Sequence, residues 1–169
     1  MRLYRLLWIF ISLSVTFQAT AQTSPMSPQG TENIDEATIE RIEIFLQRFI
    51  DPDKTVAEQA ALFTENVEYY DRGMVGKAEI LKDINYSVRR WPWRFYRLAS
   101  IDYITRDPAS VADRIFVTYT LSFEVANPSK TIAGTASYAA LIVDLNTEPK
   151  IQAITEKVRK RNRLQTLDD

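Results

Sequence analysis

Two carboxylates are the first candidates for chemistry in this sequence, since the chain contains neither histidine nor cysteine. Asp71 closes a run that begins at Val67, and strand alternation sends Tyr69 and Asp71 into a pocket if Val67 points there. A carboxylate in such a pocket can take a proton from a carbon beside a carbonyl group. Asp71-Arg72-Gly73 is also typical of a turn in which the aspartate bonds its own backbone. Both interpretations of Asp71 stay open.

Glu156 is the second candidate, and it lies in the last predicted strand. Neither face of that strand is plainly apolar, so the orientation of Glu156 stays open. If Glu156 points inward, we expect a structural ion pair with an arginine rather than a general base. One face carries Gln152, Ile154, Glu156 and Val158, and the other carries Ile151, Ala153, Thr155 and Lys157.

A dense group of aromatic and arginine side chains lies in the middle of the chain. Such residues are common at binding hot spots, and arginine stacked on tryptophan recognises planar or anionic groups. Alternatively, Trp91 and Phe95 cover the mouth of a pocket while the arginines are solvated at its rim. The group comprises Tyr86, Arg89, Arg90, Trp91, Trp93, Arg94, Phe95, Tyr96 and Arg97.

The composition excludes several other kinds of site. Without histidine and cysteine, the chain cannot form a serine–histidine or cysteine–histidine nucleophile. Only oxygen ligands remain for a metal, and Asp51-Pro52-Asp53 lacks the glycine and spaced carboxylates of a calcium loop. The four glycines form no phosphate-binding motif. We therefore expect neither a metal nor another cofactor.

Residues 1–21 have the form of a secretory signal peptide. Arg2 and Arg5 precede an apolar run, and Ala19-Thr20-Ala21 places small residues at a cleavage site. An uncleaved anchor is the alternative, but the run is shorter than the roughly 20 residues that span a bilayer. We expect cleavage before Gln22, a periplasmic or secreted protein, and no stable membrane span after cleavage.

The remaining chain is long enough for one domain. We expect a flexible leader over 22–32, a folded domain over 33–161 and a polar tail over 162–169. The net charge of -1 becomes more negative when the two signal arginines leave, which argues against a nucleic-acid partner. A small molecule or a protein is the expected partner, and a homodimer stays open.

Helical periodicity precedes strand periodicity, which predicts an α+β domain. Asn33 is the expected cap of the first helix, and Ile115, Val117, Tyr119, Leu121, Phe123 and Val125 are expected to share one strand face. The expected helices are Asn33 to Pro52, Thr55 to Phe63 and Lys77 to Arg90. The expected strands are Val67 to Asp71, Met74 to Val75, Trp93 to Thr105, Arg114 to Val125, Thr131 to Leu145 and Lys150 to Lys160.

This element order resembles the nuclear-transport-factor-2-like cone fold over about Ile34 to Arg161. The local patterns Phe63-Thr-Glu-Asn-Val-Glu-Tyr-Tyr-Asp71 and Gly76-Lys-Ala-Glu-Ile80 are similar to SnoaL-like proteins and ketosteroid isomerases. The resemblance implies a cone-shaped, curved mixed or antiparallel sheet wrapped around two to three N-terminal helices, with an apolar pocket at the open end. Trp91-Pro-Trp-Arg-Phe-Tyr96 also resembles a pattern of exported bacterial members.

The resemblance to ketosteroid isomerase places the catalytic aspartate of that family on Asp71. The family's tyrosine donor falls near Phe45, which has no hydroxyl, and its protonated acid has no evident counterpart, since the orientation of Asp102 is undetermined. Steroid isomerase activity is therefore not expected, because the donors that stabilise the developing charge are missing.

The sequence thus predicts an exported, non-enzymatic domain that binds a small apolar or anionic ligand, or a protein partner, through the pocket and its rim. The alternative is a SnoaL-like isomerase or dehydratase that uses Asp71 for proton transfer. The expected binding residues are Tyr69, Tyr86, Trp91, Trp93, Arg94, Tyr96, Tyr119 and Glu156.

Overall fold

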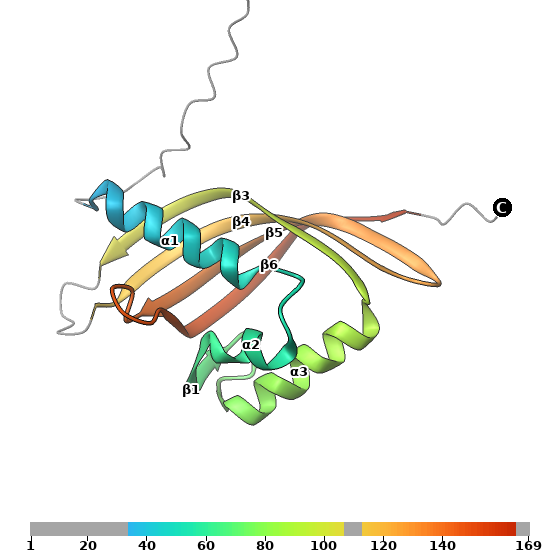
Figure 1. The fold of residues 1–169 in the computed structure, drawn as a ribbon. Helices are drawn as coiled ribbons and strands as arrows, with labels where there is room; N and C mark the ends of the chain where they lie inside the picture. Colours follow the sequence, from blue (N-terminus) through green and yellow to red (C-terminus); the bar gives the residue numbers. More distant parts are fainter. Residues whose placement is uncertain (1–33, 107–112, 165–169) are drawn as a thin grey trace, which may run out of the picture.

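The computed structural model describes residues 34–106 and 113–164, with side chains described as far as Lys157. The predicted signal peptide and leader lie outside the described residues. Three helices and six strands follow one another in the described part (Figure 1). They are α1 (Glu36–Phe49), α2 (Val56–Ala61), β1 (Phe63–Tyr69), β2 (Met74–Gly76), α3 (Lys77–Arg90), β3 (Trp93–Arg106), β4 (Ile115–Asn127), β5 (Lys130–Val143) and β6 (Lys150–Leu164).

The six strands form one sheet in the order β2-β1-β6-β5-β4-β3. β1 runs parallel to β6, and the other neighbouring pairs are antiparallel. Helix α1 lies across one face of the long strands, whereas α2 and α3 lie at the end of the molecule that holds β1 (Figure 1). The predicted α+β class and the curved mixed sheet are confirmed.

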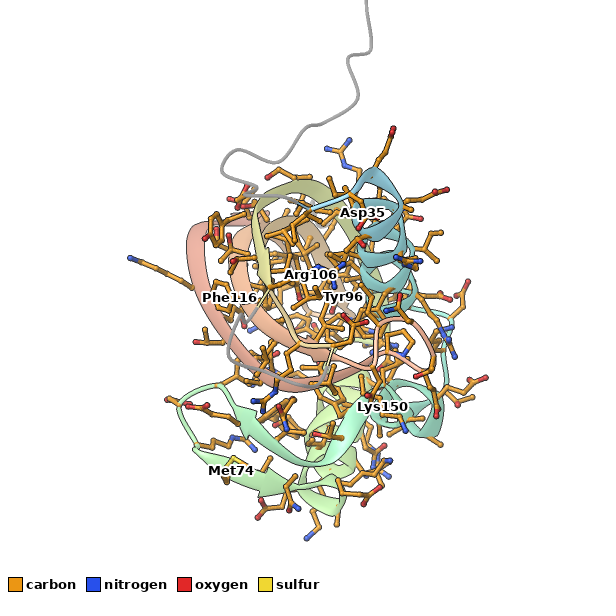
Figure 2. The ribbon with its side chains drawn as sticks, turned by 90° about the vertical axis from the view of Figure 1, so that its left-hand side faces the viewer. Asp35, Met74, Tyr96, Arg106, Phe116 and Lys150 are labelled. Atoms are coloured by element: carbon orange, nitrogen blue, oxygen red, sulfur yellow. The ribbon has the colours of Figure 1, made fainter. Side chains whose placement is uncertain are left out.

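Helix α1 begins later than the sequence pattern predicts. Asp35 is its cap, because the Asp35 carboxylate accepts a hydrogen bond from Thr38 N at 2.8 Å, so the prediction of Asn33 as the cap is wrong. Arg106, at the end of β3, donates to Thr38 Oγ1 at 3.0 Å and lies 3.5 Å from the Asp35 carboxylate (Figure 2). These contacts fix the start of α1 over the sheet.

Helix α2 ends earlier, and β1 begins earlier, than predicted. Thr55 and Glu58 form a capping box at the start of α2. The sequence pattern places Phe63 at the end of this helix, but Phe63 starts β1 and pairs with Ile151 of β6. Pairing with a strand far away in the sequence overrides the local helical preference here. The predicted helix Lys77–Arg90 is confirmed.

The core lies between α1 and the inner face of the sheet. Phe45 and Leu46 of α1 belong to one buried cluster with Val117, Tyr119 and Leu121 of β4. The predicted inner face of β4 is thereby confirmed. Burial of these large side chains is the main stabilising contribution to the fold.

Strand β6 contains an extra residue that changes its alternation. Leu141 pairs with Ala153 and Ile142 pairs with Ile151, so Gln152 has no partner in the ladder. Ile151 and Ile154 are both buried for this reason, although strict alternation would place them on opposite faces. Glu156 lies two residues beyond Ile154 and therefore shares its inward direction.

The far end of β6 continues to Leu164, past the predicted start of the polar tail. Residues Asn162 to Leu164 pair with Thr131 to Ala133 of β5, and this backbone pairing extends the strand. Residues 165–169 lie outside the described part. None of the helices that the structure describes has the length and apolar character of a membrane-spanning segment.

Candidate functional site

A cavity of about 380 Å³ lies between the inner face of the sheet, the end of α1 and helix α3. Its size is in the range of small-molecule binding sites. Its walls are mostly apolar and aromatic, and a few polar groups reach it. The lining residues are Phe49, Ile50, Gln59, Phe63, Tyr69, Tyr70, Asp83, Ile84, Ser87, Trp91, Arg94, Tyr96, Leu121, Phe123, Val125, Tyr138 and Glu156.

A row of polar side chains crosses the sheet beside this cavity. Glu156 of β6 pairs with Tyr138 of β5, and Tyr138 pairs with Tyr119 of β4. The rings of Tyr119 and Tyr138 stack with their centroids 5.3 Å apart. Tyr119 is fully buried, and its hydroxyl has no hydrogen-bond partner among the described residues. The strand register thus brings one carboxylate and two hydroxyls together.

The charge of Glu156 acts on four tyrosines, which we call the tyrosine cluster: Tyr70, Tyr96, Tyr119 and Tyr138. Burial raises the pKa of all four hydroxyls, and the charge of Glu156 adds to the shift in each. Tyr138 is the direct strand neighbour of Glu156, and the proximity of this carboxylate raises the pKa of Tyr138 further. The four hydroxyls consequently remain protonated at neutral pH and are able to donate hydrogen bonds.

A second carboxylate, Asp83 of α3, also lines the cavity. The Tyr69 hydroxyl donates to Asp83 at 2.9 Å, and Arg72 forms an ion pair with the same carboxylate. Glu156 differs, because the arginine partner expected for an inward Glu156 is absent among the described side chains. Glu156 is therefore the carboxylate available to a molecule in the cavity.

Tyr70 reaches the cavity through an unusual backbone conformation. Its φ of 51° lies in the left-handed region, which residues other than glycine seldom adopt. The Tyr70 N–H donates to Ile154 O at 2.7 Å, and its ring lies against Tyr69 with centroids 4.4 Å apart. Strained residues of this kind persist only where the surrounding structure holds them in place, and they are frequent at functional sites.

No family model and no curated protein matches this sequence. Solved structures do resemble it. The hexachlorocyclohexane dehydrochlorinase LinA type 3 from Novosphingobium barchaimii has a TM-score of 0.57 at 15% identity, over 76% of this chain and 90% of that chain. A candidate scytalone dehydratase from Novosphingobium aromaticivorans has a TM-score of 0.56 at 14% identity, over 77% and 87%.

The protein Kfla4162 from Kribbella flavida has a TM-score of 0.63 at 12% identity, over 75% of this chain and 94% of that chain. The chain has the nuclear-transport-factor-2-like cone fold. At these identities the likeness establishes the fold alone, so the activity of the cone must be inferred from its own side chains.

Asp71 lies outside the cavity of the cone. Strand β1 ends at Tyr69, and the positive φ of Tyr70 breaks the alternation on which an inward Asp71 depends. Asp71 is exposed in the following turn and does not line the cavity. The isomerase-like position therefore holds no carboxylate directed at a ligand in the cavity.

The predicted binding residues divide into two groups. Tyr69, Trp91, Arg94, Tyr96 and Glu156 line the cavity, and Tyr119 lies against Tyr138 at its wall.

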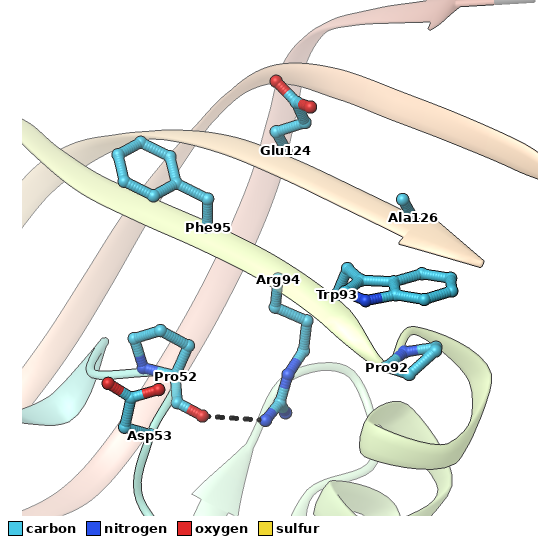
Figure 3. Close-up of a pocket in the computed structure, with 8 residues that line it drawn as sticks. All are labelled: Pro52, Asp53, Pro92, Trp93, Arg94, Phe95, Glu124 and Ala126. Atoms are coloured by element: carbon cyan, nitrogen blue, oxygen red, sulfur yellow. Dashed lines mark hydrogen bonds between the residues drawn. The ribbon is translucent and has the colours of Figure 1, made fainter. Parts of the chain in front are cut away.

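Trp93 and Tyr86 are exposed and lie outside the cavity. Alternation along β3 directs Arg94 and Tyr96 inward and Trp93 and Phe95 outward. Trp93 belongs instead to a shallow outer groove with Asp53 and Glu124 (Figure 3).

Sequence reasoning missed Tyr70, Tyr138 and Asp83. The sequence does contain a signal for Tyr138, because Tyr138 shares one face of β5 with the small, buried residues Ala136 and Ala140. Tyr70 could not have been found in this way, since strand alternation places neighbouring residues on opposite faces and so directs Tyr70 away from the face of Tyr69. Among the described residues, no group of three or more acidic side chains is arranged to hold a metal ion.

Proposed function

We propose that this protein is an acid–base enzyme of the isomerase or lyase type, which acts on a small carbonyl compound in the cone cavity. The observation that carries the proposal is the position of Glu156, a carboxylate that lines an aromatic cavity beside its strand neighbour Tyr138 and forms no ion pair with a described side chain. A base and several donors around one cavity are the parts that proton transfer beside a carbonyl requires.

The roles follow from which groups hold protons. Glu156 takes a proton from the carbon beside the carbonyl, the C–H bonding pair becomes the new C=C bond, and the π pair of the C=O bond moves onto the oxygen to give an enolate. The raised pKa values of Tyr119 and Tyr138 keep their hydroxyls protonated, so both can donate to that oxygen. Protonated Glu156 then returns the proton to another carbon, which isomerises the substrate, or the enolate expels a leaving group, which completes an elimination.

The similar solved structures support this reaction class. One is named a dehydrochlorinase and another a candidate dehydratase, and both names denote eliminations. This chain has no histidine, and the base that we assign to the same class of reaction here is the Glu156 carboxylate.

Binding without catalysis is the second candidate function. The exposed Trp93 and Phe95 favour it, because exposed aromatic side chains beside a groove are common at recognition surfaces. This candidate uses the outer groove and the rim, and it requires nothing of Glu156. The two candidates therefore place the function on different residues.

Deuterium exchange tests the proposed function with simple ketones in place of the natural substrate. We expect the protein, incubated in D₂O with 1-tetralone and a panel of other small ketones, to speed exchange of the hydrogens beside the carbonyl by about 10²-fold or more, because a positioned base acts on them. Proton NMR measures the loss of the signal at carbon 2 of 1-tetralone. Ketones that bind, as calorimetry reports, but exchange only at the buffer rate would favour the binding function instead.

A further inference from the structure

Arg94 is a cation in the wall of the cavity, and the proposed proton transfer does not use it. Its guanidinium extends from β3 toward the loop after α1, where Nη2 donates to Pro52 O at 3.1 Å (Figure 3). Its Nε is buried and has no hydrogen-bond partner among the described residues. A buried donor without an acceptor destabilises the protein, so an acceptor supplied by a ligand would be favourable at this position.

The charges around the cavity single out Arg94. Of the three charged side chains that line it, Asp83 is paired with Arg72, and Glu156 is the strand neighbour of Tyr138. Arg94 is the cation among the described lining residues, and it has no carboxylate within ion-pair distance in the described part of the chain. A guanidinium is always charged, and its fork of N–H groups matches carboxylates and sulfonates.

Arg94 borders both the outer groove and the cavity, and the charges on these two sides differ. On the outer side, Arg94 borders the groove that contains Asp53 and Glu124, whose carboxylates repel an anion. On the inner side, its neighbours are mostly aromatic, and of the two carboxylates that line the cavity Asp83 is already in an ion pair, so Glu156 is the one that has no ion-pair partner among the described side chains. An anionic group therefore meets Arg94 from inside the cavity.

We propose that Arg94 anchors the anionic group of the molecule that occupies the cavity, so that the substrates are small aromatic or aliphatic acids. This inference rests on the proposed function, because it assigns the substrate class of the same cavity. The apolar walls hold the body of the ligand, Arg94 holds its acidic group, and Glu156 remains free to act on a carbon elsewhere in the molecule.

Two fluorescent probes that differ by one anionic group test this anchor. 8-Anilinonaphthalene-1-sulfonate carries a sulfonate, and N-phenyl-1-naphthylamine is the same skeleton without it. We expect Arg94→Gln to raise the Kd of the sulfonate about ten-fold or more, as loss of a charge-assisted hydrogen bond does, and to leave the Kd of the neutral probe within about two-fold. Arg94→Lys should keep part of the preference, because it keeps the charge.

Arg97→Gln is the matched control, because Arg97 is exposed on the opposite face of β3 and its loss changes the net charge equally. We expect it to change neither Kd, and Trp93→Ala in the outer groove to do the same. If Arg94→Gln weakens the binding of both probes equally, Arg94 is not the anchor. The same conclusion follows if Trp93→Ala weakens the binding of the sulfonate. If wild-type protein binds both probes equally, the role of Arg94 as an anchor is refuted but the proposed function is not. If neither probe enters the cavity, the result counts against the proposed function as well.

Discussion

Glu156→Gln is expected to slow deuterium exchange by about 10²–10⁴-fold, which is the usual contribution of a positioned general base. The amide has nearly the same shape as the carboxylate but cannot accept the proton. The fold should persist, because the Glu156 side chain is exposed and forms no ion pair with a described side chain. The measurement is the exchange rate of 1-tetralone, with the circular dichroism spectrum as the check on folding.

Asp71→Asn is the matched control for this variant. It makes the same chemical change at an exposed carboxylate in the turn outside the cavity, and we expect it to leave the exchange rate unchanged. Undiminished exchange in Glu156→Gln would remove Glu156 from the mechanism. Loss of exchange in Asp71→Asn would return the function to the position that the isomerase resemblance indicates.

A steep loss of stability above pH 10 is the second large effect that we expect. Burial raises the pKa of Tyr69 and of the four residues of the tyrosine cluster in the folded protein. In the unfolded chain a tyrosine ionises near pH 10. Above that pH the unfolded chain releases protons that the folded protein retains, so the free energy of unfolding falls as the pH rises. Below pH 10 the hydroxyls are protonated in both states, and this contribution to stability is fully present.

Each strongly shifted tyrosine contributes a slope of about 1.4 kcal/mol per pH unit above pH 10. Urea midpoints between pH 8 and pH 12, with tyrosinate absorbance recorded in parallel, measure the combined slope. Tyr138→Phe should make the slope shallower by the share of one tyrosine. Ionisation of these tyrosines near pH 10 in the folded protein would contradict the burial of their hydroxyls.

Local periodicity in the sequence predicts the elements whose structure is decided locally. Helix α3 and the inner face of β4 follow from the spacing of their apolar residues, and both are confirmed. The order of helices followed by strands likewise predicts the α+β class. The cone itself follows from the resemblance of this order and of two local patterns to a known fold.

The site depends on two departures from periodicity that the sequence does not reveal. The bulge at Gln152 arises from pairing with β5, and it directs Glu156 toward the cavity. The positive φ at Tyr70 arises where β1 leaves the sheet, and it turns Tyr70 inward and leaves Asp71 in solvent. Both are set by partners far away in the chain, so alternation alone gives the wrong direction at Asp71 and no direction at Glu156.

A crystal structure with 1-naphthol tests the central claim most directly, because this phenol has the planar shape of the enol of 1-tetralone. The account predicts that the ring occupies the cavity, with the naphthol oxygen within hydrogen-bond distance of the Tyr119 or Tyr138 hydroxyl and the Glu156 carboxylate beside the ring. A naphthol bound in the outer groove at Trp93, with the cavity unoccupied, would contradict it.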